Sequence, residues 1–151
     1  MSMTHSAPLS KREVEQLVVN WYRDLDVHRP LGDVLQYISE AELEMVLPET
    51  TVRDLGEAEQ LLQNWYHSFF DEVHTLLSLD TTISPGGQRA DVRLVVRWEA
   101  SRWKAPAAKS ERLIMDAYQT WIVTRSAASG KPVITGYVVN ELKLMPGSAS
   151  L

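Results

Sequence analysis

The sequence predicts an α+β protein in which helices cover one face of an antiparallel sheet. From Val73 to Met145, apolar and polar side chains alternate with a period of two, and short turns interrupt the pattern, which is typical of consecutive antiparallel strands. Before Val73, apolar residues recur every three or four positions, as they do on one face of a helix. This order, helices followed by a run of strands, is typical of the α+β class.

Length and composition indicate one domain over residues 1–151 and exclude several kinds of site. The net charge is −5 and no basic cluster stands out, which argues against nucleic acid as a partner. The absence of cysteine excludes disulfides, thiolate metal sites and cysteine nucleophiles. We expect neither a signal peptide nor a membrane helix, and therefore a cytoplasmic protein.

The helical part is expected to follow a flexible tail at residues 1–9. Ser10 and Glu13 have the spacing of a capping box, which predicts the start of a helix. The apolar face of this helix contains Val14, Leu17, Val18, Trp21, Tyr22 and Leu25. His28-Arg29-Pro30 ends it, and Pro30 is suited to the first turn of a second, shorter helix.

A short hairpin and a third helix come next. Glu42–Leu47 is predicted to be a strand that Pro48 stops, with Thr51–Asp54 returning beside it. Gly56 opens the third helix. The wide aromatic face of that helix contains Leu61, Leu62, Trp65, Tyr66, Phe69, Phe70 and Val73.

Four long strands complete the predicted fold, and residues 146–151 are expected to be a second flexible tail. The strands cover Val73–Ser84, Ala90–Trp103, Glu111–Arg125 and Val133–Met145. Strands of roughly 12 residues must twist and curl. The third strand presents Leu113, Met115, Ala117, Gln119, Trp121 and Val123 on one face and Ile114, Asp116, Tyr118, Thr120 and Ile122 on the other. Alternation assigns residues to faces, but it leaves open which face is inside.

The order of elements resembles the nuclear-transport-factor-2-like superfamily, in particular its SnoaL-like branch. The resemblance covers about Ser10 to Met145. The motifs that carry it are Asn20-Trp21-Tyr22-Arg23-Asp24-Leu25-Asp26, Leu47-Pro48-Glu49, Gly56, His74 and Val133-Ile134-Thr135-Gly136-Tyr137. It implies a cone-shaped curved antiparallel sheet, with three N-terminal helices packed on its concave face and a pocket at the open end.

The resemblance also implies a class of ligand and of chemistry. The family includes polyketide cyclases, ketosteroid isomerase, scytalone dehydratase and limonene epoxide hydrolase, together with binding proteins that catalyse nothing. Its members are often homodimers through the outer sheet face. We therefore expect a small hydrophobic or aromatic ligand, no cofactor and a homodimer.

His74, Tyr22 and Asp116 are the candidates for general acid–base catalysis. His74 stands where the third helix meets the first long strand, a position that often lines the pocket in the family. Two roles are open for His74. Its imidazole would act as a general acid or base, or the residue is a structural histidine that is hydrogen-bonded to the backbone. Scytalone dehydratase is similar in placing a Tyr and an Asp on this helix. By that resemblance, Tyr22 would donate a hydrogen bond to a substrate oxygen. Asp26 is either that ligand-binding carboxylate, or a helix cap or solvated residue.

Asp116 lies between Ile114 and Tyr118 on its strand face, where an unpaired carboxylate is costly. It is therefore either a buried base or the partner of an arginine on a neighbouring strand, for which Arg93, Arg97 and Arg112 are the candidates.

Arg97 and Glu99 share a strand face two residues apart, similar to an Arg and Asp of limonene epoxide hydrolase. The other essential carboxylate of that enzyme would fall near Val139, which is apolar here. Epoxide hydrolysis is therefore disfavoured, and solvated cross-strand pairs are the alternative. The residues expected to contact a ligand are Trp21, Asp26, Trp65, Phe69, Arg97, Glu99, Tyr118 and Tyr137.

Other classes of site find no support in the sequence. No histidine pair has the spacing of a metal site, and phosphate-loop, GxGxxG and GxSxG motifs are missing. Two functions stay open: isomerase, cyclase or dehydratase chemistry on a hydrophobic molecule, and a non-catalytic ligand-binding or protein-interaction domain of the same fold.

Overall fold

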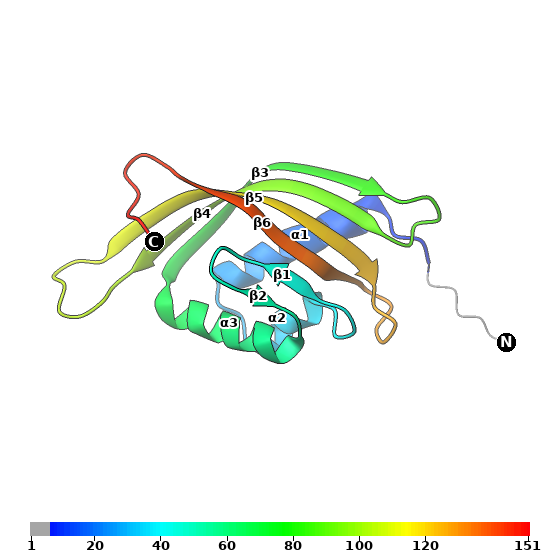
Figure 1. Cartoon of the computed structure of the whole chain (residues 1–151), viewed down its shortest axis with the longest axis horizontal. Coiled ribbons are helices and arrows are strands. Elements are labelled where there is room, and N and C mark those ends of the chain that lie inside the picture. Colours follow the sequence, from blue (N-terminus) through cyan, green and yellow to red (C-terminus); the bar gives the residue numbers. More distant parts are fainter. Residues whose placement is uncertain (1–6) are drawn as a thin grey trace.

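The computed structural model describes residues 7–151 and confirms the predicted α+β class (Figure 1). The helices are α1 (Lys11–Asp26), α2 (Leu31–Val34) and α3 (Leu55–Ser68), with a 3-10 turn, η1 (Leu35–Tyr37), after α2. The strands are β1 (Glu44–Val46), β2 (Thr51–Val52), β3 (Phe70–Ile83), β4 (Ala90–Arg102), β5 (Glu111–Arg125) and β6 (Pro132–Leu144). Within the described residues, no helix is long and apolar enough to cross a membrane.

The strands form one mixed sheet in the order β2-β1-β6-β5-β4-β3. Strands β3 to β6 form the predicted antiparallel meander. The short hairpin also forms, but β1 pairs in parallel with β6, so that Met45 lies between Val52 and Tyr137. The expectation of a wholly antiparallel sheet is therefore corrected at one pair. Alternation within a strand carries no information about a partner some 90 residues away, which is why the sequence did not predict this pairing.

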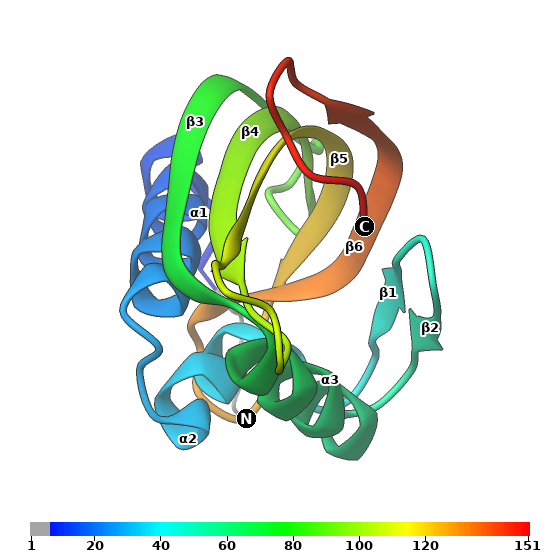
Figure 2. The ribbon, with the colours of Figure 1, turned by 90° about the vertical axis from the view of Figure 1, so that its left-hand side faces the viewer.

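The sheet bends into an open arch that partly encloses the helices (Figure 2). Helix α1 packs against β3 and β6, and α3 crosses below the arch. Irregularities in register occur between Leu76 and Ser78 in β3 and between Tyr118 and Gln119 in β5. Bulges of this kind increase local twist, and they help long strands to curl.

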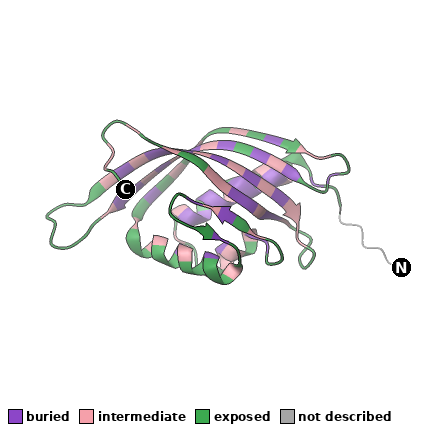
Figure 3. Ribbon diagram, viewed as in Figure 1, coloured by how far each residue is buried: buried purple, intermediate pink, exposed green. Residues whose placement is uncertain are grey.

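The concave face of the arch is the buried face (Figure 3). Trp21 of α1 and Trp121 of β5 are 1% and 0% exposed, and their rings meet edge to face with centroids 6.4 Å apart. The inner side chains of β4 and β5 include Val92, Leu94, Val96, Trp98, Leu113 and Met115, all buried. The alternative that the sequence left open is settled by this packing, because the apolar stripe of α1 can be buried only against an apolar sheet face.

Helix boundaries agree with the sequence at α1 and differ at α3. The capping box of α1 is present, with the Glu13 amide donating to Ser10 Oγ at 3.2 Å. Helix α3 begins one residue before Gly56, after an Asp54 cap. It ends at Ser68 rather than continuing to Val73, because Phe69 has an extended backbone and leads directly into β3.

The two expected tails are only partly described. Residues 1–6 lie outside the described part of the chain, but Leu9 is buried and its amide donates to Gly87 O at 2.9 Å. Residues 146–151 run beside the start of β5. There the Ala149 amide donates to Arg112 O at 2.9 Å, and Ser148 Oγ accepts from the Ile114 amide at 2.8 Å.

Candidate functional site

A cavity of about 640 Å³ lies between the concave sheet face, α3 and the β1–β2 turn, a size typical of small-molecule sites. Among the described side chains that line it, only Glu49 and His74 can carry a formal charge. The others are Leu47, Pro48, Thr50, Leu61, Asn64, Trp65, Ser68, Phe69, Val96, Trp98, Ala117, Gln119, Tyr137, Val139, Leu142 and Leu151. The lining is therefore largely apolar and aromatic, with a few polar groups.

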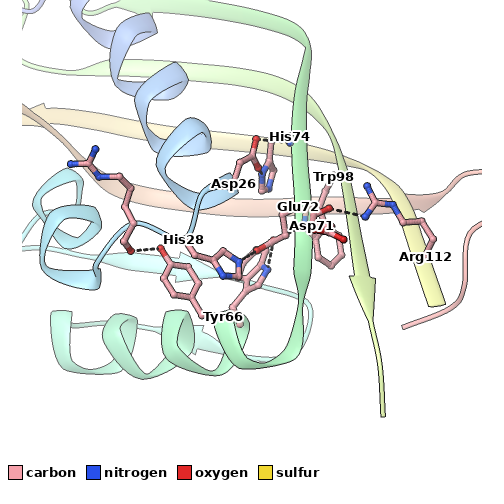
Figure 4. A network of polar contacts seen from close by, with 10 residues as sticks. Asp26, His28, Tyr66, Asp71, Glu72, His74, Trp98 and Arg112 are labelled. Atoms are coloured by element: carbon pink, nitrogen blue, oxygen red, sulfur yellow. Dashed lines mark hydrogen bonds and ion pairs between the residues drawn. The ribbon is translucent and has the colours of Figure 1, made fainter. Parts of the chain in front are cut away.

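His74 and Asp26 form a hydrogen-bonded pair at the edge of this cavity (Figure 4). His74 Nδ1 lies 2.6 Å from Asp26 Oδ1, and the His74 backbone amide donates to Asp26 Oδ2 at 3.0 Å. Asp26 is the last residue of α1, so the pair also joins that helix to β3. Because a carboxylate only accepts, the hydrogen of the neutral imidazole lies on Nδ1. His74 Nε2 is then left with a free lone pair.

Gln119 lines the cavity, whereas Tyr22, expected as a catalytic residue, does not line it and instead contacts both His74 and Gln119. The Tyr22 ring stacks on the His74 imidazole with centroids 4.6 Å apart, and its hydroxyl donates to Gln119 Oε1 at 3.1 Å. Trp121 Nε1 donates to the same oxygen at 2.9 Å. Burial raises the pKa of Tyr22 well above its usual value, so the phenol keeps its proton. Tyr137 lies nearby, and burial raises the pKa of its phenol too.

A second buried carboxylate, Glu72, holds two walls of the cavity (Figure 4). Its Oε1 accepts from Trp65 Nε1 and from Trp98 Nε1, each at 2.9 Å, and both indoles line the cavity. Its Oε2 pairs with His28 Nε2, and the His28 ring stacks on Tyr66 with centroids 4.2 Å apart. The Glu72 side chain is 1% exposed, so these contacts are shielded from water.

The backbone on both sides of this network is in the left-handed region, which side chains other than glycine seldom adopt. His28 has φ of 50° and Asp71, the residue before Glu72, has φ of 51°. Arg112 Nη1 donates to Asp71 O at 2.7 Å and stabilises that turn. The turn lets Glu72 and His74 share the inner side of β3 while Val73 points outward.

Asp116 does not reach the cavity, which removes it from the catalytic candidates. It lies on the convex face of β5, where Arg97 Nε and Nη2 donate to its two carboxylate oxygens at 2.7 and 3.0 Å. These hydrogen bonds hold the pKa of Asp116 below its usual value, the opposite of what a base at neutral pH needs. Of the two alternatives, the structure has the ion pair.

Arg97, Glu99 and Tyr118 share that convex face and do not line the cavity, contrary to the expectation that they contact a ligand. The reason is the strand period: Trp98 and Ala117 point inward, so their neighbours point outward. Trp21 is buried in the core, and neither it nor Asp26 lines the cavity, whereas Trp65, Phe69 and Tyr137 line it as predicted.

The sequence did not identify two polar residues of the site. Gln119 had a usable signal, because it is the one amide on the otherwise apolar inner face of β5. Glu72 had none, since its burial depends on the turn at Asp71. Within residues 7–151, no group of three or more His, Cys, Asp or Glu side chains is arranged to hold a metal ion.

Comparisons with known proteins identify the fold. No protein-family model and no curated protein matches the chain. Among solved structures, a hexachlorocyclohexane dehydrochlorinase, LinA-type3 from Novosphingobium barchaimii, has a TM-score of 0.72 at 13% identity, over 93% of each chain. A Novosphingobium aromaticivorans protein, provisionally named scytalone dehydratase, has a TM-score of 0.69 at 15% identity, over 93% of this chain and 88% of that one. A Streptomyces avermitilis protein of the NTF2-like family, provisionally named a dehydratase, has a TM-score of 0.68 at 10% identity, over 84% and 92%.

The chain has the NTF2-like fold. The predicted resemblance to this superfamily is thereby confirmed at the level of the fold, together with the cone-shaped α+β architecture. At these identities the likeness extends to the fold alone, and NTF2-like proteins differ widely in what they do. Function must therefore be argued from the cavity.

Proposed function

We propose that this NTF2-like protein is a cofactor-independent lyase or isomerase that removes a proton from carbon in a small hydrophobic or aromatic molecule. The observation that carries the proposal is the hydrogen bond from His74 Nδ1 to Asp26 at the edge of an apolar cavity. His74 is the general base, acting through Nε2. The names of the dehydratase and dehydrochlorinase neighbours, which are elimination enzymes, support this class of reaction.

Asp26 orients His74 and stabilises its cation. With Nδ1 donating to Asp26, Nε2 is the nitrogen that can accept a proton from substrate. The imidazolium that forms lies 2.6 Å from a carboxylate oxygen, so its charge is compensated without moving any side chain. The captured proton then leaves with a departing group, as in a dehydratase, or returns to another carbon, as in an isomerase.

The cavity favours an uncharged ligand. No Lys or Arg is present among the described side chains that line it, and the one carboxylate, Glu49, would repel an anion. Trp65, Phe69 and Trp98 offer aromatic edges and faces to a flat ring. A neutral molecule of one or two rings therefore suits this site.

Proton exchange in deuterium oxide tests the proposal without knowledge of the natural substrate. The probe is α-tetralone, a neutral two-ring ketone with an acidic C–H next to its carbonyl. The wild-type protein is expected to accelerate the loss of the proton NMR signal of that C–H as it exchanges for deuterium. His74→Asn is expected to lower the rate by about 10²–10⁴-fold, the usual contribution of a general base.

Matched variants separate catalysis from folding. Asp26→Asn is expected to slow exchange while leaving the cavity intact, because an amide can still accept from the imidazole but carries no charge. His67 lies in the last turn of α3 and outside the cavity lining. The His67→Asn variant is therefore expected to catalyse proton exchange in α-tetralone at the wild-type rate. Exchange that is equally fast in wild type and in a folded His74→Asn protein would refute the role of His74.

One observation favours a second function, a ligand-binding protein without catalysis. The same Asp26 carboxylate also accepts from the His74 backbone amide, so the pair anchors α1 to β3 whether or not it moves protons. In that case α-tetralone would bind, and the His74→Asn variant would lose stability without any change in exchange rate.

A homodimer and a cytoplasmic location are further proposals. The convex sheet face carries apolar side chains that a second copy would cover, among them Val73 and Leu77, which are 44% and 47% exposed. Sedimentation of the wild type as a monomer at micromolar concentration would exclude the dimer. Fractionation of the source cells would test the location.

A further inference from the structure

Two imidazole–carboxylate pairs join the end of α1 to the start of β3 (Figure 4). Asp26, the last residue of α1, pairs with His74, and His28, two residues later, pairs with Glu72. The carboxylate comes from α1 in the first pair and from β3 in the second. His74 lines the cavity, whereas neither His28 nor Glu72 does. A ligand in the cavity can thus reach His74 but not the second pair.

The turn at residues 27–30, directly after α1, is anchored to the rest of the protein by the side chain of His28. The other three side chains of this turn are exposed, and only His28 is half-buried. Its backbone φ of 50° lies in the left-handed region, which is unfavourable for a residue with a side chain, so surrounding contacts must hold it. The His28 ring makes such contacts, because it stacks on Tyr66 of α3 and pairs with Glu72 of β3.

Glu72 is a rigid partner for this anchor. One of its carboxylate oxygens accepts from two indoles of the cavity wall, the other pairs with His28, and its side chain is 1% exposed. A buried carboxylate held by three donors has little freedom to rotate. The position of His28 relative to β3 is thereby fixed, and with it the position of Asp26, two residues away along the chain. Asp26 in turn determines which nitrogen of His74 carries the hydrogen.

We propose that His28 and Glu72 are positioning residues for the general base, because their contact holds the end of α1 where the Asp26 carboxylate meets His74 Nδ1. The inference rests on the proposed function and adds to it how the orientation of the base is maintained. Without this contact the turn after α1 relaxes, the hydrogen bond from His74 to Asp26 weakens, and the imidazole exchanges into its Nε2–H form. That form has no lone pair on Nε2 to accept a proton, so proton abstraction slows.

Nitrogen NMR of the whole chain, labelled at its histidine ring nitrogens, measures the tautomers directly. A ring nitrogen that carries a hydrogen and one that has a lone pair differ widely in chemical shift. The two pairs predict opposite tautomers in alkaline buffer: His74 carries its hydrogen on Nδ1 and His28 on Nε2, since each of these nitrogens faces a carboxylate. The signals are assigned by their loss in the His74→Asn and His28→Ala variants.

Two variants remove the anchor and a third retains it. His28→Phe keeps a ring on Tyr66 but has no N–H, and His28→Ala removes the ring as well. In both, His74 is expected to show a mixture of tautomers, and kcat for proton exchange in α-tetralone is expected to fall about 10–10²-fold with little change in KM. In Glu72→Gln, the amide oxygen can still accept from the indoles and the amide nitrogen can donate to His28. There His28 is expected to switch to its Nδ1–H form while His74 keeps its tautomer.

Gly87→Ala is the matched control for a general loss of stability. Gly87 lies beside Leu9, before the start of α1, and a Cβ there would clash with a proline side chain. This variant is expected to leave both the His74 tautomer and the exchange rate unchanged. If it perturbed them as much as His28→Ala does, or if both His28 variants kept the wild-type tautomer of His74, the positioning role would be refuted.

The two measurements separate this inference from the proposed function. A mixture of His74 tautomers in the His28 variants, together with exchange that does not depend on His74, would support the positioning role and refute the catalytic function. Exchange that depends on His74 but is unchanged in both His28 variants would do the reverse.

Discussion

Glu72 is expected to be among the most important single polar residues for the stability of this protein. Its carboxylate is almost fully buried and accepts from Trp65 Nε1 and Trp98 Nε1, both at 2.9 Å, while its other oxygen pairs with His28. Glu72→Ala leaves all three groups without their acceptor. A buried donor that loses its partner costs about 1–3 kcal/mol, which over three contacts gives about 3–9 kcal/mol.

The expected loss for Glu72→Ala is near the lower end of that range, about 3 kcal/mol. Trp98 is 7% exposed and loses its bond in full, whereas Trp65 is only half-buried and regains part of its bond from water. Glu72→Gln is expected to lose about 1–2 kcal/mol, because its amide oxygen can still accept from both indoles but carries no charge. For a domain of this length, 3 kcal/mol corresponds to about 6–12 °C in melting temperature.

Urea unfolding followed by tryptophan fluorescence measures these losses, and Glu111→Gln is the matched control. Glu111 also accepts from an arginine, Arg102, at 2.7 Å, but its side chain is 59% exposed. Its replacement is expected to change the free energy of unfolding by less than about 0.5 kcal/mol. If Glu72→Ala were no less stable than Glu111→Gln, burial of the Glu72 network would not stabilise the fold.

Two other predictions concern charge and backbone geometry. Because Arg97 holds the pKa of Asp116 below its usual value, this pair stabilises the protein above the pKa of an unfolded aspartate and the benefit is lost as pH falls through the folded pKa. Asp116→Asn should therefore weaken the fall in the free energy of unfolding at acid pH. The loss of stability at pH 7 is expected to be small, because the Arg97 side chain is 38% exposed. An unchanged dependence on acid pH would contradict the pairing. At the β3–β4 turn, Gly86 and Gly87 both have positive φ, but a Cβ at Gly87 would lie 2.5 Å from a proline side chain whereas one at Gly86 would meet nothing within 4 Å. By thermal unfolding, Gly86→Ala is expected to lower the free energy of unfolding by about 1–2 kcal/mol, and Gly87→Ala is expected to lower it clearly more. Equal losses would contradict the close contact between Gly87 and the proline side chain.

The sequence determined the elements whose patterns are local. The capping box at Ser10 and Glu13 correctly marked the start of α1, and the period-two alternation correctly found β3 to β6. It also grouped Asp116 with Tyr118 and Gln119 with Trp121 on opposite faces of β5. Caps and alternation depend on neighbours within a few residues, so one sequence contains them completely.

Only the tertiary structure decided which of those groups form a site. Choosing the inner face required the packing of α1 on the sheet, and that choice placed Asp116 outside and Gln119 inside the cavity. The partner of His74 is Asp26, 48 positions earlier in the chain, and the turn at Asp71 that buries Glu72 follows from contacts with Arg112, 41 positions later. Such pairs depend on where the curled sheet brings α1 and β5 relative to β3, and no local pattern encodes that distance.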